Sequence, residues 1–149
     1  MTASHEHFAF SLLKTFLANL ARTNITHPGA PHIVIATPRA QHHEMGAYLA
    51  NTAAANCGWR VTFLGPDLPA AEIAIAARQC GARAVALSLV YPITDASLTG
   101  ELTQLKNALP PECALVIGGR AAGAHATLIN QIGATLIEDL TVFCTWLSR

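Results

Sequence analysis

Residues 31–67 read PHIVIATPRAQHHEMGAYLANTAAANCGWRVTFLGPD, and this stretch decides the fold because it places a helix between two short strands. Ile33–Ala36 is a fully apolar run, and Arg60–Leu64 is a second strand that ends at a Gly-Pro-Asp turn. The residues between them, from about His43 to Asn56, have the length and composition of a helix. Consecutive strands joined through a helix are parallel, so this stretch predicts one strand–helix–strand unit of a parallel sheet.

The same alternation continues to the end of the chain. We expect further strands at 84–87, 113–117 and 133–136, and helices at 69–80, 95–109, 121–132 and 139–147. The strands are continuous apolar runs, which is typical of strands buried on both faces of a parallel sheet. The sequence therefore predicts an α/β fold of the flavodoxin-like (Rossmann-like) type, a doubly wound five-stranded parallel sheet in the order 2-1-3-4-5.

An extra helix precedes this sheet. Residues 5–21 carry large apolar residues at helical spacing, namely Phe8, Leu12, Leu13, Phe16, Leu17 and Leu20. Residues 23–31 are rich in turn-forming residues around Pro28 and Gly29. We therefore expect an N-terminal helix and linker over residues 1–30 and one domain over residues 31–149.

The composition limits the kinds of partner. A chain of 149 residues that is 52% hydrophobic and 12% charged is one folded domain rather than a disordered tail. Its formal net charge of zero lacks the basic surplus that direct binding to nucleic acid or to an acidic membrane surface needs. Because charges are so few, we expect apolar surface that meets a ligand or another chain.

Cysteine spacing and hydropathy indicate the compartment. The four cysteines (Cys57, Cys80, Cys113 and Cys144) stand far apart without a CxxC pair, which favours reduced thiols over a disulfide framework. The N-terminal residues lack the basic start of a secretory signal, and no apolar run approaches the roughly 20 residues that cross a bilayer. We therefore expect a cytoplasmic protein.

The loop after the first strand, Thr37–Gly46, is the first candidate site, because ligands of such sheets bind over the carboxyl ends of the strands. It lacks the glycine-rich turn of dinucleotide binders, the Walker motif, the acidic residues of a phospho-acceptor and the Ser/Thr-rich loop of a flavodoxin. It offers instead His43, three residues before Gly46. A neutral imidazole is a good ligand for a transition metal, although a surface histidine at a helix start would look the same.

The loops after the third and fourth strands carry small residues. Ser88 ends the third strand and is followed by apolar residues, and Gly118-Gly119 follows the fourth. Taken alone, the serine reads as a buried hydroxyl bonded to backbone, and the glycines read as a tight turn. The glycine pair would also allow a bulky planar group to approach the backbone closely.

Together, HxxG after the first strand, the serine at the end of the third and GG after the fourth resemble the cobalamin-binding domain. The wider matches are TPRAQHHEMGAYLA, VTFLGPDLPAAEIAIAA, AVALSLVYP and LVIGGRAAG. The chain is similar to the domain found in MerR-type light-responsive transcriptional repressors and in corrinoid methyl-carrier proteins. The resemblance covers about residues 31–149 and implies cobalamin, with its cobalt, as the cofactor.

The resemblance also implies how the cofactor is held. Cobalamin would bind base-off, with its nucleotide tail displaced from the cobalt and His43 as the lower axial ligand of the metal. The implied cofactor-binding residues are Gln41, His42, His43, Glu44, Met45, Gly46, Ser88, Leu89, Val90, Thr94, Gly118 and Gly119.

The displaced tail would enter a slot beside the sheet. The resemblance implies that Ser88 bonds the displaced base and that Leu89 and Val90 line the slot. Thr94 would lie further along it, and Gly118-Gly119 would let the tail pass against backbone. A deep, mostly apolar groove with a few polar contacts suits such an amphiphilic tail.

Two features depart from the family. Gln41 stands where the family has an acidic residue two positions before the histidine. Its side-chain oxygen can accept a hydrogen bond from the imidazole without a negative charge, so we expect weaker tuning of the ligand. About thirty residues precede the sheet, whereas family members use a four-helix bundle to cover the upper corrin face. A protein partner or a second copy would then cap the corrin, or the cofactor would be held more openly.

The apolar stripe of the first helix has two interpretations. Phe8, Leu12, Phe16 and Leu20 either supply contact to such a partner or pack on their own domain.

These inferences favour a stand-alone cobalamin-binding module that senses or carries the cofactor for a partner in transcription regulation. Two alternatives stay open: a corrinoid carrier subunit in methyl transfer, and a degenerate module that binds another tetrapyrrole, such as haem, or none. No nucleophile–base pair with an orienting partner lies at the strand ends, so we do not expect an enzyme.

Overall fold

The sheet has five parallel strands in the order β2-β1-β3-β4-β5 in the computed structural model, which describes residues 2–24 and 26–149. The strands are β1 (His32–Pro38), β2 (Arg60–Leu68), β3 (Ala84–Ser88), β4 (Ala114–Gly118) and β5 (Thr135–Leu136). The helices are α1 (Ala3–Arg22), α2 (Met45–Asn56), α3 (Ala70–Gln79), α4 (Leu98–Ala108), the 3-10 helix η1 (Ala122–His125), α5 (Ala126–Gln131) and α6 (Leu140–Leu147). The predicted fold class and strand order are confirmed.

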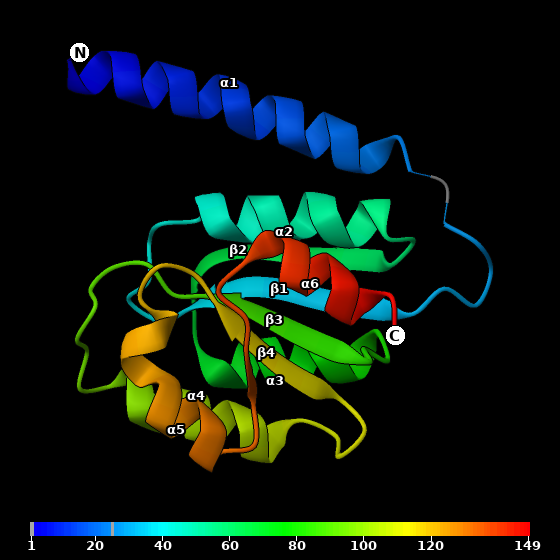
Figure 1. Ribbon diagram of the computed structural model, residues 1–149, viewed down its shortest axis with the longest axis vertical. Coiled ribbons are helices and arrows are strands. Elements are labelled where there is room, and N and C mark those ends of the chain that lie inside the picture. The colour runs from blue at the N-terminus through cyan, green and yellow to red at the C-terminus, as the bar shows by residue number, and fades with distance from the viewer. Residues whose placement is uncertain (1, 25) are drawn as a thin grey trace.

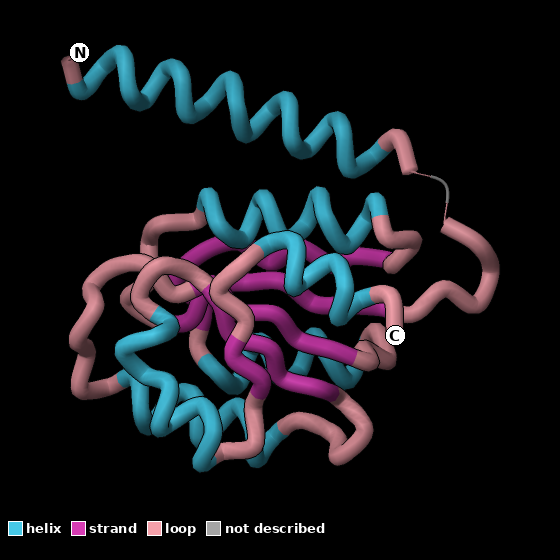
Figure 2. The backbone as a smooth tube through the Cα atoms, in the orientation of Figure 1, coloured by secondary structure: helices cyan, strands magenta, loops and turns pink. Residues whose placement is uncertain are grey.

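Helices cover both faces of the sheet. Figure 1 shows α2 and α6 over one face and α3, α4 and α5 over the other, and Figure 2 shows the same layers with α1 outside α2. Alternate residues of β1 serve the two cores: Ile33 and Ile35 pack with α2 and α6, whereas Val34 and Ala36 pack with α3 and α4. This double burial explains why the strands read as unbroken apolar runs.

β1 and β2 are longer than predicted. β1 continues to Pro38 and β2 to Leu68, and these two residues are partners in the ladder. The Thr37 hydroxyl accepts a hydrogen bond from the Asp67 backbone N–H at 3.0 Å, which joins the two extra segments. Their composition is typical of loops, but residues 37–38 and 65–68 belong to the sheet because the two segments pair with one another.

Two helices begin later than predicted. α2 begins at Met45 rather than at His43, and α4 begins at Leu98 rather than at Asp95. The Asp95 carboxylate accepts hydrogen bonds from the backbone N–H and the hydroxyl of Ser97, at 2.9 and 2.7 Å. These bonds form a turn ahead of α4, as short polar side chains commonly do before a helix.

The C-terminal third also differs in detail. The single helix predicted over 121–132 is η1 followed by α5, and the change falls at His125, whose Nε2 is 2.7 Å from the Ile93 carbonyl oxygen. The strand predicted over 133–136 is shorter, because Gly133 has a φ of +69° and still belongs to the turn that ends α5.

α1 packs on α2 through a small contact. Leu17 is its one buried residue, and the Lys14 ammonium pairs with the Glu44 carboxylate. The hydrogen bond that Lys14 donates to Glu44 raises the pKa of Lys14. The large apolar side chains Phe8, Leu12, Leu13, Phe16 and Leu20 are exposed. The stripe of α1 therefore faces away from its own domain.

Within the described residues, no helix has both the length and the apolar character that crossing a membrane requires. The four cysteines are free thiols, as predicted. Burial raises the pKa of Cys113 to about 11, so this thiol is protonated at neutral pH and is a weak nucleophile.

Candidate functional site

A cleft of about 160 Å³ opens between α2 and α6 and reaches the carboxyl ends of β3 and β4. Most of its lining is apolar, which suits a flat or amphiphilic ligand. Its principal lining residues are Gly46 and Leu49 of α2, Ser88 of β3, Gly118 of β4, and Leu140 and Phe143 of α6.

Gly46 and Ser88 face one another across this cleft. A Cβ atom added at Gly46 would collide with the Ser88 hydroxyl oxygen, so a glycine at position 46 leaves room for Ser88 in this rotamer. That oxygen is buried and is without a hydrogen-bond partner among the described residues. An unpaired buried hydroxyl is costly in an apolar cleft, and a ligand that hydrogen-bonds it would remove this cost.

Gly118 and Gly119 are required by the protein's own backbone. A Cβ at Gly118 would collide with the Ile137 carbonyl oxygen, and one at Gly119 would lie 2.8 Å from the Leu89 nitrogen. Gly119 also has a φ of +96°, which side chains other than hydrogen rarely allow. Both glycines line the cleft, so backbone is exposed to a ligand there.

His43 is exposed in the loop between β1 and α2, shortly before Gly46. Its ring meets the Tyr91 ring edge-on, with 6.0 Å between the centroids. Tyr91 lies in the loop after β3 and was not among the predicted site residues. Tyr91 lies within the stretch AVALSLVYP that carries the resemblance, three residues after Ser88.

Gln41 is fully buried, and its amide binds the loop after β3. Its Oε1 accepts hydrogen bonds from the backbone N–H groups of Val90 (2.9 Å) and Tyr91 (3.0 Å). Its Nε2 donates to the Pro92 carbonyl oxygen at 3.1 Å. The sequence suggested that this oxygen accepts a bond from the His43 imidazole; in the structure both of its lone pairs are directed to backbone N–H groups instead.

The neighbours of His43 in sequence have separate contacts. The exposed His42 has its Nδ1 3.8 Å from the Asp67 carboxylate. Glu44 binds Lys14 of α1, and Met45 begins α2. The side chains on either side of His43 are therefore directed to different partners, Asp67 and Lys14.

Three of the predicted residues after Ser88 do not line the cleft. Leu89 is fully buried in the core on the opposite face of the sheet, among residues of α3 and α4. Val90 is half-buried and meets Gln41 through its backbone, and Thr94 is exposed further along the loop. The structure therefore brings together Gly46, Ser88, Gly118 and Gly119 at the cleft, but not these three side chains.

The sequence did not identify the contribution of α6. Leu140 and Phe143 line the cleft, and Asp139 caps the helix by accepting hydrogen bonds from the N–H groups of Thr141 and Val142. These bonds lower the pKa of Asp139, and the bond from Val142 has the larger effect. The sequence indicates that a helix begins at Asp139. It does not indicate that this helix packs beside the cleft, because that depends on contacts with residues distant in sequence.

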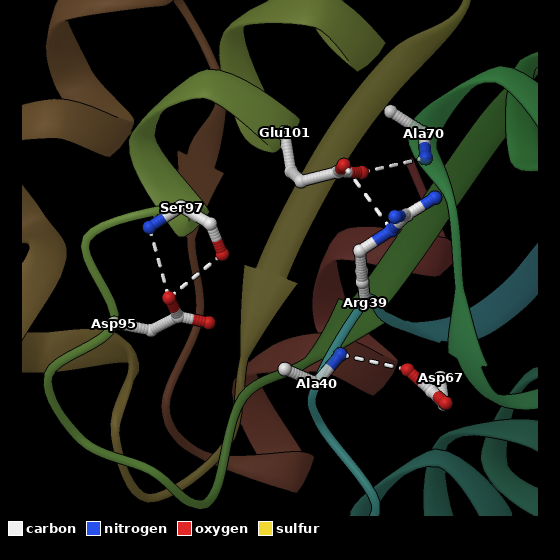
Figure 3. Close-up of polar contacts among 7 residues, drawn as sticks. All are labelled: Arg39, Ala40, Asp67, Ala70, Asp95, Ser97 and Glu101. Atoms are coloured by element: carbon white, nitrogen blue, oxygen red, sulfur yellow. Dashed lines mark hydrogen bonds and ion pairs between the residues drawn. The ribbon is translucent and has the colours of Figure 1, made fainter.

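Polar contacts join the residues after β1 to the end of β2 and to α4, and α4 to the start of α3 (Figure 3). Glu101 of α4 accepts a hydrogen bond from the Ala70 N–H at 2.8 Å, and its other oxygen is 3.5 Å from Arg39 Nε. Asp67 accepts from the Ala40 N–H at 2.8 Å. Ala40 and Asp67 have φ values of +67° and +59°, a strained conformation that persists only where the surroundings hold it.

The fold and the cleft define a doubly wound α/β domain with a candidate ligand site at the carboxyl edge of the sheet. The chain matches the B12 binding domain over residues 31–139. It is 31% identical to the HTH-type transcriptional repressor CarA of Myxococcus xanthus, over 93% of this chain and 48% of that protein. It is 27% identical to the repressor CarH of the same organism, over 93% of this chain and 46% of that protein.

The chain therefore belongs to the B12-binding domain family, and cobalamin is its cofactor. It spans about half the length of the curated relatives that it matches.

Solved structures share the fold. A cobalamin-binding protein from Desulfitobacterium hafniense DCB-2 aligns with a TM-score of 0.65 and 20% identity, over 78% of this chain and 57% of that one. The monomethylamine corrinoid protein of Methanosarcina barkeri aligns with a TM-score of 0.67 and 18% identity, over 94% of this chain and 64% of that one. At these identities the likeness establishes the architecture.

The residues present fit this cofactor. In the described part of the chain, no three His, Cys, Asp or Glu side chains cluster closely enough to hold a metal ion. Because cobalamin would bring its own ring of ligands to the cobalt, it does not need such a cluster of protein side chains. The apolar cleft with its unpaired Ser88 hydroxyl suits a flat, amphiphilic ligand.

Proposed function

We propose that the domain holds cobalamin base-off with His43 as the lower axial ligand, and that it acts as a cobalamin sensor in transcription regulation. The observation that carries this proposal is the buried, unpaired hydroxyl of Ser88 in an apolar cleft. Ser88 lies beside Gly46, which belongs to the first turn of α2, directly after the loop that carries His43. The cleft suits the displaced base, and the exposed imidazole suits the metal.

Each side chain has one role in this proposal. A neutral His43 imidazole donates a nitrogen lone pair to the metal, and because the ring is exposed no core rearrangement is needed. Ser88 hydrogen-bonds the displaced base, and Leu140 and Phe143 exclude water from its faces. Bound cobalamin supplies a cobalt centre with an exchangeable upper ligand, and the chain's own residues hold it in place.

The regulatory role is favoured by the 31% identity to a transcriptional repressor along almost the whole of this chain. The likeness to a corrinoid protein is at 18% identity, which carries the fold and not the function. With a net charge of zero, the domain would act on transcription through a protein rather than by contacting nucleic acid itself. No side-chain catalysis is part of this proposal.

We place the cobalamin-binding domain at residues 31–149. The family match ends at residue 139, but α6 beyond it contributes Leu140 and Phe143 to the cleft. α1 and the linker lie outside this unit.

Ser88→Ala tests the proposed tail slot. We expect the variant to bind hydroxocobalamin about tenfold more weakly than the wild type, because one hydrogen bond to the displaced base is lost. The apo variant should unfold within about 1 kcal/mol of the wild type, because the hydroxyl that is removed has no partner. Absorption titrations and urea unfolding measure the two quantities.

Ser148→Ala, an exposed serine at the end of α6, is the control and should change neither quantity. Equal affinities of Ser88→Ala and wild type would contradict the slot. A wild-type protein that leaves the hydroxocobalamin spectrum unchanged, or that prefers haem, would contradict the proposed function as a whole. Loss of the upper ligand on illumination of the adenosylcobalamin complex supports a sensor, whereas methylation of the reduced cofactor by a methyltransferase supports a carrier.

We propose further that the exposed stripe of α1 binds a second copy of this chain. In an antiparallel pair of α1 helices centred on Lys14, Phe8 would meet Leu20 of the second copy, and Leu12 would meet Phe16 of the second copy. None of these side chains is charged, so the stripe is complementary to itself, as a two-fold interface requires. Lys14 points to the opposite side of the helix, where it binds Glu44.

The exposed area supports a dimer. Phe8 and Phe16 are 66% and 63% exposed, and Leu12, Leu13 and Leu20 are 39–56% exposed. Two such stripes together remove about 1,000 Å² of apolar surface from water, which is near the lower bound for a specific interface.

The double variant Leu12→Glu/Phe16→Glu tests this interface. We expect the wild type to sediment as a dimer at about 100 µM and the variant as a monomer. At a protein concentration low enough for both to be monomeric, the two should have the same thermal midpoint, because both positions are exposed in one copy. Ile75→Glu places the same charge on an exposed apolar position of α3 and should leave the dimer intact. A monomeric wild type, or a dimer that survives the double substitution, would refute the contact.

A further inference from the structure

We infer that Gln41 is a positioning residue that acts on His43 through the loop after β3 and the ring of Tyr91, and not by a bond to the imidazole. This inference rests on the proposed role of His43. It assigns Tyr91 to the ligand site as the neighbour that orients the axial imidazole.

The amide of Gln41 is matched to the loop that it binds. Two backbone N–H groups, of Val90 and Tyr91, need an acceptor, and the Pro92 carbonyl needs a donor. A carboxamide supplies both from one side chain, whereas a carboxylate supplies only the acceptor. Since Gln41 is fully buried, water is not available to replace either partner.

The backbone of Gln41 is also fixed. Its N–H donates to the Pro38 carbonyl oxygen at 3.0 Å, and its own carbonyl accepts from the Thr37 hydroxyl and from the Asp67 N–H. Gln41 therefore links the end of β1, which leads into the His43 loop, to the loop after β3. The two loops that meet at the site are held in one arrangement by this residue.

Tyr91 depends on this arrangement for its position. Its side chain is 63% exposed, so packing does little to hold it, whereas its backbone N–H is bonded to Gln41. Its ring lies edge-on to the His43 ring at 6.0 Å, a geometry that favours one orientation of an aromatic pair. An imidazole whose ring plane is held before the metal arrives loses less freedom on ligation.

Gln41→Glu separates this inference from its rival. If Gln41 were a weak substitute for the acidic residue of the family, the carboxylate would strengthen the imidazole as a ligand and cobalamin would bind more tightly. Our inference predicts the opposite, because the carboxylate would face the Pro92 carbonyl without a proton between them. We expect hydroxocobalamin to bind about tenfold more weakly.

The apo protein provides an independent readout. In Gln41→Glu, amide hydrogen exchange should become faster at residues 89–91 and 93, before any cofactor is added, because the Pro92 carbonyl has lost its hydrogen-bond donor and the loop is held less firmly. Gln79→Glu makes the same chemical change at an exposed position at the end of α3 and should alter neither exchange at these residues nor affinity.

Tyr91→Ala completes the test and is expected to fold normally, because the side chain is exposed. We expect it to bind hydroxocobalamin about tenfold more weakly with an unchanged thermal midpoint. If Gln41 acts through Tyr91, Gln41→Glu/Tyr91→Ala should bind no more weakly than Gln41→Glu alone.

Three results would overturn the inference: tighter binding by Gln41→Glu, unchanged binding by Tyr91→Ala, or losses that add in the double variant. Failure of the proposed function gives a different result. In that case the hydroxocobalamin spectrum would be the same with His43 and with His43→Ala, whether residue 41 is Gln or Glu.

Discussion

His43→Ala is expected to weaken hydroxocobalamin binding by about 100-fold or more and to remove the absorption features of a histidine-ligated complex. The reason is that alanine has no nitrogen lone pair to replace that of the proposed imidazole ligand. Because His43 is exposed, the substitution should leave the fold and the thermal midpoint unchanged. Titration followed by absorption spectroscopy measures both the affinity and the ligation state.

His27→Ala is the matched control, an exposed histidine in the linker that should leave affinity and spectrum as in the wild type. Free imidazole added to His43→Ala should restore part of the histidine-ligated spectrum, because it can occupy the vacated position. Identical spectra for wild type and His43→Ala would mean that another group ligates the metal.

Gly119→Ala is expected to destabilise the domain by about 3 kcal/mol or more. The new Cβ would lie 2.8 Å from the Leu89 nitrogen and nearer still to its carbonyl oxygen, and backbone cannot move aside as a flexible side chain does. The φ of +96° adds conformational strain. Urea unfolding of the apo protein gives the change in the free energy of unfolding.

Gly133→Ala separates the two causes of this loss. Gly133 also has a positive φ, +69°, but a Cβ added there meets nothing within 4 Å. We expect about 1 kcal/mol of destabilisation from conformation alone. Equal losses at the two positions would show that the approach of Gly119 to Leu89 is not tight.

The parallel sheet was predictable because burial of its strands on both faces leaves a local pattern in the sequence. Ile33–Ala36 is apolar throughout, since its alternate residues serve two cores. The extension of β1 to Pro38 left no such trace, because it depends on pairing with Leu68, which is distant in sequence. The late start of α4 likewise depends on the hydrogen bond that the Asp95 carboxylate accepts from the Ser97 backbone N–H.

The candidate site was predictable where small residues permit close approach. Gly46 and Ser88, which the resemblance implied as cofactor-binding residues, both line the cleft, because the ends of neighbouring strands and their helices converge there. The resemblance assigned both Ser88 and Leu89 to the cofactor site. In the structure the side chains of consecutive residues point to opposite faces of the sheet, so Leu89 is buried in the other core. The partners of Gln41 are some fifty residues away, and no local pattern identifies them.

Electron paramagnetic resonance of the reduced, cob(II)alamin-bound protein tests the central claim most directly, because the unpaired electron couples to the axial nitrogen. The protein is prepared once with natural-abundance histidine and once with nitrogen-15 histidine, and unlabelled cobalamin is added to both. If His43 is the lower ligand, each line of the spectrum splits into three with the natural protein and into two with the labelled one. A threefold splitting that persists in the labelled protein would show that the nucleotide base still holds the cobalt, and would contradict the account.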